Sequence, residues 1–147
     1  MPKLDLEAIE ATNRSSYPAP FAADMGRRRF RRLAPAGGLT DFGVTHVVLK
    51  PGGISSQRHW HDKIDEFIVI VAGEAVLVED EGETVMRAGD CAAFPKGVPN
   101  GHHLVNRSER DCVFVAAGGN EGDCYYPDVD LHWNEAGYYS RKDGTPY

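Results

Sequence analysis

The sequence predicts an all-β fold, either a sandwich or a barrel of short strands, on three observations. Glycine and proline are frequent, with 16 and 9 copies, and they favour many turns over long helices. Short runs rich in apolar and β-branched residues recur along the chain. Turn residues separate these runs at short intervals, which is typical of strands joined by tight connections.

The chain divides into an arm, a barrel and a tail. A length of 147 residues suits one hydrophobic core and is too short for two comfortable ones. Residues 1–26 predict an N-terminal arm with a short helix at 4–11 and a proline-containing connector. We expect the barrel at 27–118 and a C-terminal tail that packs on it at 119–147.

The expected strands follow the arm in order, and each is bounded by turn residues such as PGG, AGE, DEGE, AGD and PKGVPNG. They lie at residues 27–33, 41–53, 55–61, 65–74, 75–80, 83–90, 91–95, 102–106 and 111–119.

The segment at 66–72 is apolar on both faces after its glutamate. One face should line the core, so Phe67, Val69 and Val71 need a second cover. The N-terminal arm or another subunit could supply it, and a homodimer through this sheet is therefore one expectation.

From the charge and composition we expect the binding partners of this protein to be small molecules. Sixteen basic and 22 acidic residues give a net charge of −6, which argues against nucleic-acid binding and against an anionic membrane surface. No apolar run approaches the ~18 residues of a membrane span. Acids stand near the N-terminus where a signal peptide would be basic and then apolar, so we expect a cytoplasmic protein.

The three cysteines, Cys91, Cys112 and Cys124, show no CxxC spacing. Their odd number fits a reducing compartment better than a disulfide framework. We therefore interpret each of them as a core residue rather than a metal ligand.

The stretch RHWHDKIDE, residues 58–66, carries the strongest chemical signal. In a strand, side chains alternate between faces, so His59 and His61 point together and Trp60 points away. Glu66 approaches from the neighbouring strand, and His102 or His103 can add an imidazole from a distant one. Imidazole with carboxylate suits Fe, Mn, Ni, Co, Cu or Zn rather than Ca or Mg.

Two spaced motifs resemble those of the cupin superfamily of small β-barrels. The first, G(X)5HXH(X)3-4E(X)6G, is matched by Gly53, His59, His61, Glu66 and Gly73. The second, G(X)5PXG(X)2H(X)3N, is matched by Gly89, Pro95, Gly97, His102 and Asn106, with four residues rather than two before the histidine. Counting back from Asn106 selects His102, and His103 would then point to the opposite face.

The resemblance extends over roughly residues 40–118, and the tail resembles that of small bacterial single-domain cupins. It implies a double-stranded β-helix, or jelly-roll barrel, of six to eight strands. It also implies one divalent transition metal ion in the wider mouth, bound by His59, His61, Glu66 and His102. Four protein ligands leave one or two positions open for substrate or water.

Several functions fit such a centre. The first is a metalloenzyme acting on a small organic substrate, either a cofactor-independent oxygenase or an isomerase or lyase, in which Glu66 is both ligand and catalytic proton carrier. The second is a non-catalytic module that binds or senses a small ligand. A dry pocket would be lined by residues in phase with the ligands, namely Gln57, Ile68, Ile70, Thr45 or His46, and Phe94.

The run at residues 27–32 is the only dense positive patch in the sequence. Its five guanidinium groups could bind phosphate or carboxylate in bidentate fashion, which suggests a sugar-phosphate substrate. The resemblance to cupins then implies a sugar-phosphate isomerase-like protein as one alternative. The simpler interpretation, which we favour at this point, is an edge strand kept soluble by charge with Phe30 inward.

Overall fold

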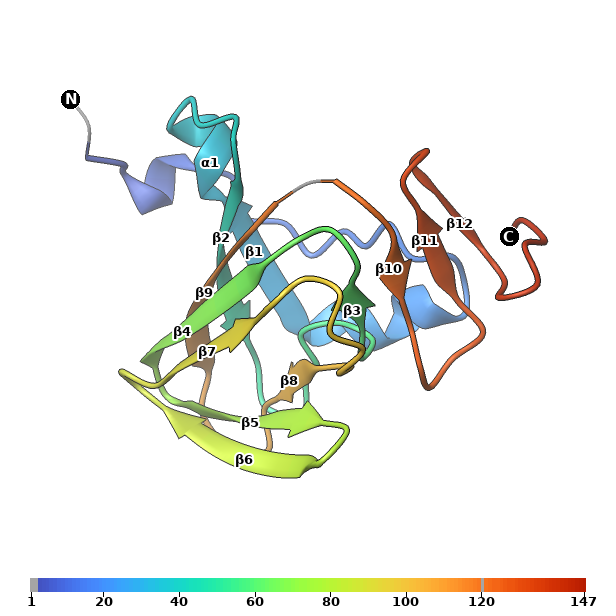
Figure 1. Cartoon of the computed structure of the whole chain (residues 1–147). Coiled ribbons are helices and arrows are strands. Elements are labelled where there is room, and N and C mark those ends of the chain that lie inside the picture. Colours follow the sequence, from blue (N-terminus) through green and yellow to red (C-terminus); the bar gives the residue numbers. More distant parts are fainter. Residues whose placement is uncertain (1–2, 120) are drawn as a thin grey trace.

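A computed structural model describes residues 3–119 and 121–147 (Figure 1). The helices are short, and β-strands form most of the regular secondary structure. The 3-10 helices are η1 (Leu6–Ala8) and η2 (Phe21–Arg27), and the α-helix is α1 (Leu33–Ala36). The strands are β1 (Arg28–Arg32), β2 (Gly43–Leu49), β3 (Trp60–His61), β4 (Glu66–Ala72), β5 (Glu74–Glu79), β6 (Gly82–Arg87), β7 (Cys91–Phe94), β8 (His103–Val105), β9 (Cys112–Gly118), β10 (Cys124–Tyr125), β11 (His132–Asn134) and β12 (Tyr138–Ser140).

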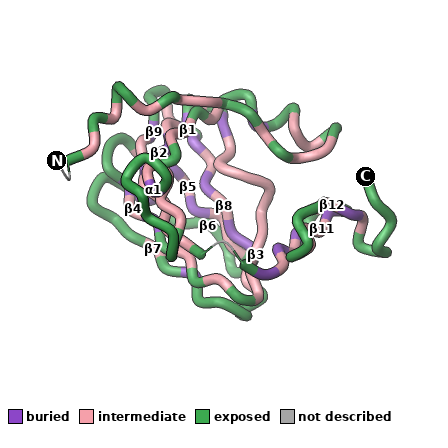
Figure 2. The backbone as a smooth tube through the Cα atoms, turned by 90° about the horizontal axis from the view of Figure 1, so that it is seen from above, coloured by how far each residue is buried: buried purple, intermediate pink, exposed green. Residues whose placement is uncertain are grey.

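Two antiparallel sheets form the main body. One has five strands in the order β1-β2-β9-β4-β7, and the other has three in the order β6-β5-β8. Apolar side chains at alternate positions of these strands are buried between the sheets. Figure 2 colours the buried residues of β5 and β8 purple. The buried core is Val47, Leu49, Ile68, Ile70, Ala75, Leu77, Met86, Phe94, Leu104, Cys112 and Phe114.

A third sheet, with the order β12-β11-β10-β3, joins the tail to the strand that carries His61. We call this the tail sheet. It lies to one side of the main body in Figure 1, and its buried cluster consists of Cys124, Tyr126 and Leu131 with aromatic rings packed around them. The tail therefore contacts the barrel through the histidine motif.

Two residues of the motifs have structural roles. Gly73 joins β4 to β5 at φ +73°, and a Cβ there would lie 2.4 Å from the backbone oxygen of Asp111. Only glycine fits such a turn. Asn106 is fully buried, and its Nδ2 donates to the oxygens of Leu49 and Arg110, each at 2.7 Å.

The strands expected between residues 27 and 119 are present, although β3 is restricted to Trp60 and His61. The helix expected at 4–11 is wrong in extent, since only the single 3-10 turn η1 forms. Beyond it the backbone of Thr12 exchanges hydrogen bonds with Phe30 at 2.9 and 2.8 Å, so the arm continues as an extended neighbour of β1. Neither α1 nor the strands β10 to β12 were expected.

The outer face of β4 is exposed, with 44% of Phe67 and 53% of Val71 accessible. The arm pairs with β1, which is an edge strand of the sheet and is separated from β4 by β2 and β9. It therefore does not cover these residues. A homodimer through this face stays a prediction.

The cysteines differ from one another. Cys112 and Cys124 are buried as free thiols, whereas Cys91 is exposed, so the expectation of a core position was wrong for Cys91. In the described part of the chain, no helix has the length and apolar character needed to cross a membrane.

Candidate metal centre

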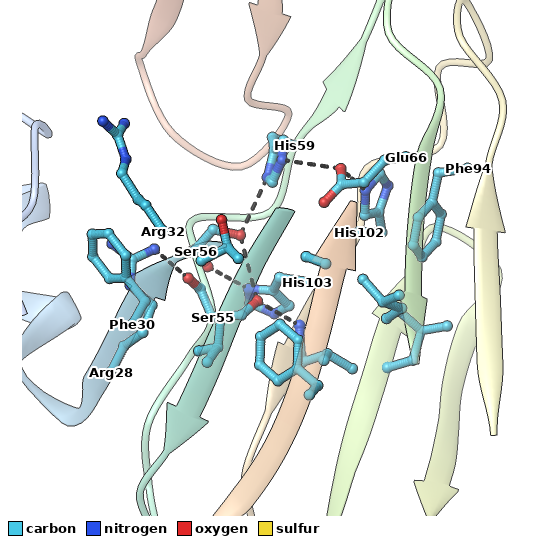
Figure 3. A pocket seen from close by; sticks show the side chains of 17 residues that line it. Arg28, Phe30, Arg32, Ser55, Ser56, His59, Glu66, Phe94, His102 and His103 are labelled. Atoms are coloured by element: carbon cyan, nitrogen blue, oxygen red, sulfur yellow. Dashed lines mark hydrogen bonds and ion pairs between the residues drawn. The ribbon is translucent and has the colours of Figure 1, made fainter. Parts of the chain in front are cut away.

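Backbone pairing brings the two histidine motifs together. His59 and His102 form an isolated bridge in which the His59 N–H donates to the His102 oxygen at 3.2 Å and the reverse bond measures 2.9 Å. His61 follows on β3, and Glu66 begins β4. Segments more than 35 residues apart in the sequence therefore face one cavity (Figure 3).

The donor atoms converge on one carboxylate oxygen. The Oε2 atom of Glu66 lies 3.8 Å from Nε2 of His59, 3.5 Å from Nε2 of His61 and 3.2 Å from Nε2 of His102. Donor atoms of His59, Glu66 and His102 all lie within 4.8 Å of one another. Ligands of a common ion, each about 2.1 Å from it, have separations of this order.

Hydrogen bonds orient two of the rings. Nδ1 of His59 lies 2.9 Å from the oxygen of Gln57, and Nδ1 of His102 lies 3.1 Å from the oxygen of Asn100. A carbonyl only accepts, so each Nδ1 carries the hydrogen and each Nε2 presents a lone pair toward Glu66. Lone pairs that face a carboxylate are unfavourable unless a cation or proton lies between them, and this donor set fits a transition metal ion.

Burial and charge set the protonation of the cluster. Burial lowers the pKa of His59 to about 4, although the charge of Glu66 opposes the shift, so this ring is neutral near pH 7. Burial alone would raise the pKa of Glu66. The histidines around its carboxylate outweigh burial and hold the pKa of Glu66 below its usual range.

The cluster opens into a cavity of about 280 Å³ with mixed walls. Figure 3 shows Glu66 and His102 beside Phe94 on the right and His59 near the middle, and all four side chains line the cavity. The expected lining residues Ile68, Thr45 and Phe94 are present, while Gln57, Ile70 and His46 are not among the cavity residues. The remaining apolar walls come from Phe30, Val47, Leu77, Leu104, Phe114 and Ala116.

His46 points away from the cavity because of strand register. It pairs with Arg31 on β1, whereas the neighbouring inward positions pair Phe30 with Val47 and Arg32 with Thr45. The alternation along β2 therefore leaves Thr45 inside and His46 on the outer face.

His102 and His103 both line the cavity, but they make different contacts. His102 stacks on Phe94 with ring centroids 3.5 Å apart and reaches Glu66. The Nδ1 of His103 instead lies 2.9 Å from the oxygen of Ser56, which holds its ring beside the serines. We expected His103 to point to the opposite face of the strand from His102, but His103 also lines the cavity.

The arginine run is split by the same alternation. Arg28, Phe30 and Arg32 lie on the cavity side of β1, and Arg29 and Arg31 lie on the other face. Phe30 points inward as expected, and β1 is an edge strand of its sheet. Arg28 donates to the oxygen of Ser55 at 2.6 Å and lies 5.1 Å from the Phe30 ring centre.

Sequence reasoning missed Ser55, Ser56 and Cys124. The serines line the cavity, and Cys124 lies with His59 and His61 in a second group of donor atoms within 4.8 Å. The serines belong to an expected strand that is not extended at this point, so alternation could not place them. The sequence of the tail did not predict a strand at Cys124, so its pairing with His61 could not be foreseen.

Known proteins resemble this chain in sequence and in fold. A family model described as "Cupin domain" matches residues 45–118. The chain is similar to a solved sugar phosphate isomerase of the cupin superfamily from Silicibacter pomeroyi, with 46% identity, a TM-score of 0.94, and 99% of this chain and 96% of that chain covered.

More distant structures share the fold alone. A Cupin 2 conserved barrel domain protein from Salinispora arenicola has 24% identity and a TM-score of 0.58, covering 82% of this chain and 87% of that chain. A polyketide cyclase from Streptomyces resistomycificus has 21% identity and a TM-score of 0.67, covering 83% and 81%. The comparison with curated proteins gives no match. The matched residues, the fold and the 46% identical structure show that this chain belongs to the cupin superfamily.

Proposed function

We propose that this cupin is a metal-dependent isomerase acting on a small phosphorylated sugar or a related hydroxy-carbonyl compound. The single observation that carries the proposal is the composition of one cavity. His59, Glu66 and His102 line it together with Arg28 and Arg32, two guanidinium groups with no acidic partner in the described ranges. The name sugar phosphate isomerase, printed for the 46% identical Silicibacter pomeroyi protein, adds support.

The proposed ligands are His59, His61, Glu66 and His102, and the proposed ion is one divalent transition metal, Fe, Mn, Ni, Zn, Co or Cu. The three Nε2 atoms within 3.8 Å of one carboxylate oxygen support this assignment. When bound, such an ion polarises a carbonyl or hydroxyl oxygen of the substrate. The protein residues then hold the substrate in place and move its protons.

Arg28 is the proposed anchor for the substrate phosphate. Its bond to the Ser55 oxygen fixes the guanidinium, while its Nε is buried and has no hydrogen-bond partner among the described residues. A buried N–H without a partner costs free energy, and a bound anion would accept from it. Arg32 at the edge of the same cavity adds a second positive charge (Figure 3).

Two residues can carry the proton that an aldose–ketose isomerisation moves between neighbouring carbons. Glu66 is ionised and lies among the proposed ligands, so its free oxygen can accept a proton from substrate. His103 lines the same cavity, and because its Nδ1 is engaged by Ser56, its Nε2 is the nitrogen left for a substrate.

The cavity restricts both water and substrate size. Ile68, Leu77, Phe94 and Phe114 line it with apolar groups, and its volume of about 280 Å³ lies at the small end of ligand sites. Electrostatic effects are stronger where water is excluded. A compound of a few carbons with one anionic end fits this enclosure better than a large polyketide or nucleotide.

Hydrogen exchange at the substrate tests this proposal whichever isomer is the product. Metal-loaded protein is incubated in D2O with a panel of short phosphorylated aldoses and ketoses, and deuterium at the carbon next to the carbonyl is followed by NMR. We expect exchange and isomer formation that depend on added metal. We expect Glu66→Gln to lose both exchange and bound metal, and His103→Gln to keep the metal and lose most of the exchange.

Other outcomes would overturn the isomerase. Oxygen uptake by iron-loaded protein with flavonols, thiols or diketones, without exchange on any phosphosugar, would indicate an oxygenase. Binding of a phosphosugar with no exchange under any metal would indicate the non-catalytic binding module.

A further inference from the structure

The tail strand β10 places a thiol beside the proposed metal centre. In the antiparallel pairing of β10 with β3, Cys124 is directly opposite His61 and Tyr125 is opposite Trp60. Directly opposed residues share one face of a sheet, with Cβ atoms about 5 Å apart. The Trp60 and Tyr125 rings stack on the other face at 4.4 Å, which fixes this register.

The donor atoms of this face form a second potential ligand set. One nitrogen of His59, one nitrogen of His61 and Sγ of Cys124 lie within 4.8 Å of one another. Around a tetrahedral ion with Zn–N distances of about 2.1 Å and a Zn–S distance of about 2.3 Å, nitrogen and sulfur donors lie about 3.6 Å apart. Small side-chain rotations would bring the three atoms onto one ion.

His59 belongs both to this set and to the set with Glu66 and His102. His61 links the two sets again, because its Nε2 lies 3.5 Å from Glu66. The thiol therefore lies at one side of the same centre and not at a separate site. Cys124 is 4% exposed, so solvent ligands do not compete for this position as they would at the surface.

We propose that Cys124 is a sulfur ligand of this centre when the ion is thiophilic, in addition to the imidazoles and the carboxylate. This inference rests on the proposed metal site. On binding, the sulfur–metal bond forms, the S–H bond breaks, and the proton leaves to solvent. Such a donor set favours Zn, Co, Cu or Fe over Mn, because thiolate selects softer ions.

The inference also gives the tail sheet a role. Metal binding would tie β10 to the motif strand through Sγ, in addition to the backbone pairing of β10 with β3. The chain offers two matched controls, because Cys112 is equally buried in the barrel core and Cys91 is exposed. Neither belongs to a group of metal-ligand donors in the described residues.

Cobalt spectroscopy tests the sulfur contact. Metal-free wild type, Cys124→Ser, Cys112→Ser and Cys91→Ser are titrated with Co²⁺ under reducing, anaerobic conditions, and bound cobalt is quantified after gel filtration. We expect wild type and both control variants to show a near-ultraviolet sulfur-to-cobalt charge-transfer band together with visible cobalt bands. Cys124→Ser should retain the visible bands and lose the charge-transfer band.

A second measurement avoids dependence on the folding of a variant. X-ray absorption of zinc-loaded wild type should show a sulfur scatterer at about 2.3 Å. Bound cobalt without a charge-transfer band, or bound zinc with nitrogen and oxygen neighbours only, would overturn the role of Cys124 and leave the proposed metal centre standing. Absence of bound metal would overturn both proposals. A charge-transfer band that survives in Cys124→Ser would likewise exclude this cysteine.

Discussion

The main body and the tail sheet are stabilised by different kinds of side chain. Between the five-stranded and three-stranded sheets the core is mostly aliphatic, with Ile68, Ile70 and Leu77 as typical members. In the tail sheet the buried residues Cys124, Tyr126 and Leu131 are surrounded mainly by aromatic rings. The histidine motif lies where the two regions meet, because His59 pairs with His102 and His61 pairs with Cys124. The site therefore depends on both regions.

The largest expected effect on stability comes from the barrel. Gly73→Ala should lower the free energy of unfolding by roughly 2–4 kcal/mol, since alanine at positive φ is strained and the nearest atom is backbone rather than a movable side chain. Gly144→Ala, in the tail, should cost only about 1 kcal/mol because its Cβ would meet nothing within 4 Å. Urea denaturation measures both. Equal losses would contradict the distinction.

A substitution in the cavity should weaken substrate binding without preventing folding. Arg28→Gln should raise KM for a phosphorylated substrate by roughly tenfold or more, since a charge-assisted bond to phosphate contributes about 1.5–3 kcal/mol. Arg29→Gln is the matched control, because Arg29 lies on the outer face of the same strand. Steady-state kinetics of the two variants with phosphorylated and unphosphorylated substrates measures this difference in KM. A similar KM in both variants would argue against an anion anchor.

Much of the main body could be predicted from sequence, because strands such as β4 and β9 are continuous apolar runs of about seven residues bounded by turn residues. The tail could not, since β10 has two residues and β11 and β12 have three, which is too short to show a period of two. Spacing also selected the candidate ligands His59, His61, Glu66 and His102, and their side chains lie close to one another in the structure. The sequence alone could not show which arginines of residues 27–32 face the cavity, because this depends on the register of β1 on β2.

The pH dependence of the metal-free protein should report on His59. The folded pKa of this ring, about 4, lies below the unfolded value near 6.5, so the unfolded state binds more protons between these limits. Stability should therefore fall as pH is lowered from about 6.5 to about 4, by at most roughly 1.4 kcal/mol per pH unit for one proton. Below this window, protonation of Glu66 should lower it further, because its folded pKa is also depressed.

Guanidinium denaturation in the presence of a chelator, repeated across this range, measures the slope. His59→Gln should flatten it between pH 6.5 and 4, the limits set by the two states of the ring. An unchanged slope would show that His59 is not the group responsible.

The smallest effect concerns the connection between the two regions. Arg58 donates to both oxygens of Asp128 in the tail at 2.7 Å and also pairs with Asp80 next to β5. The two carboxylates are about half exposed, which weakens both pairs, so Arg58→Ala should cost about 1 kcal/mol overall. Hydrogen exchange should nevertheless increase in β10 to β12 more than in β4 and β9. A uniform increase would mean that tail and barrel open as one unit.

The proposed function depends on one transition metal ion bound by His59, His61, Glu66 and His102, and the metal content of the purified protein tests whether this ion is present. Protein purified without chelator should contain close to one ion per chain by mass spectrometric metal analysis, and the His59→Ala, His61→Ala double variant, verified as folded, should contain almost none. If the wild type and the double variant are equally empty after incubation with each candidate ion, the proposed centre and the isomerase built on it are wrong.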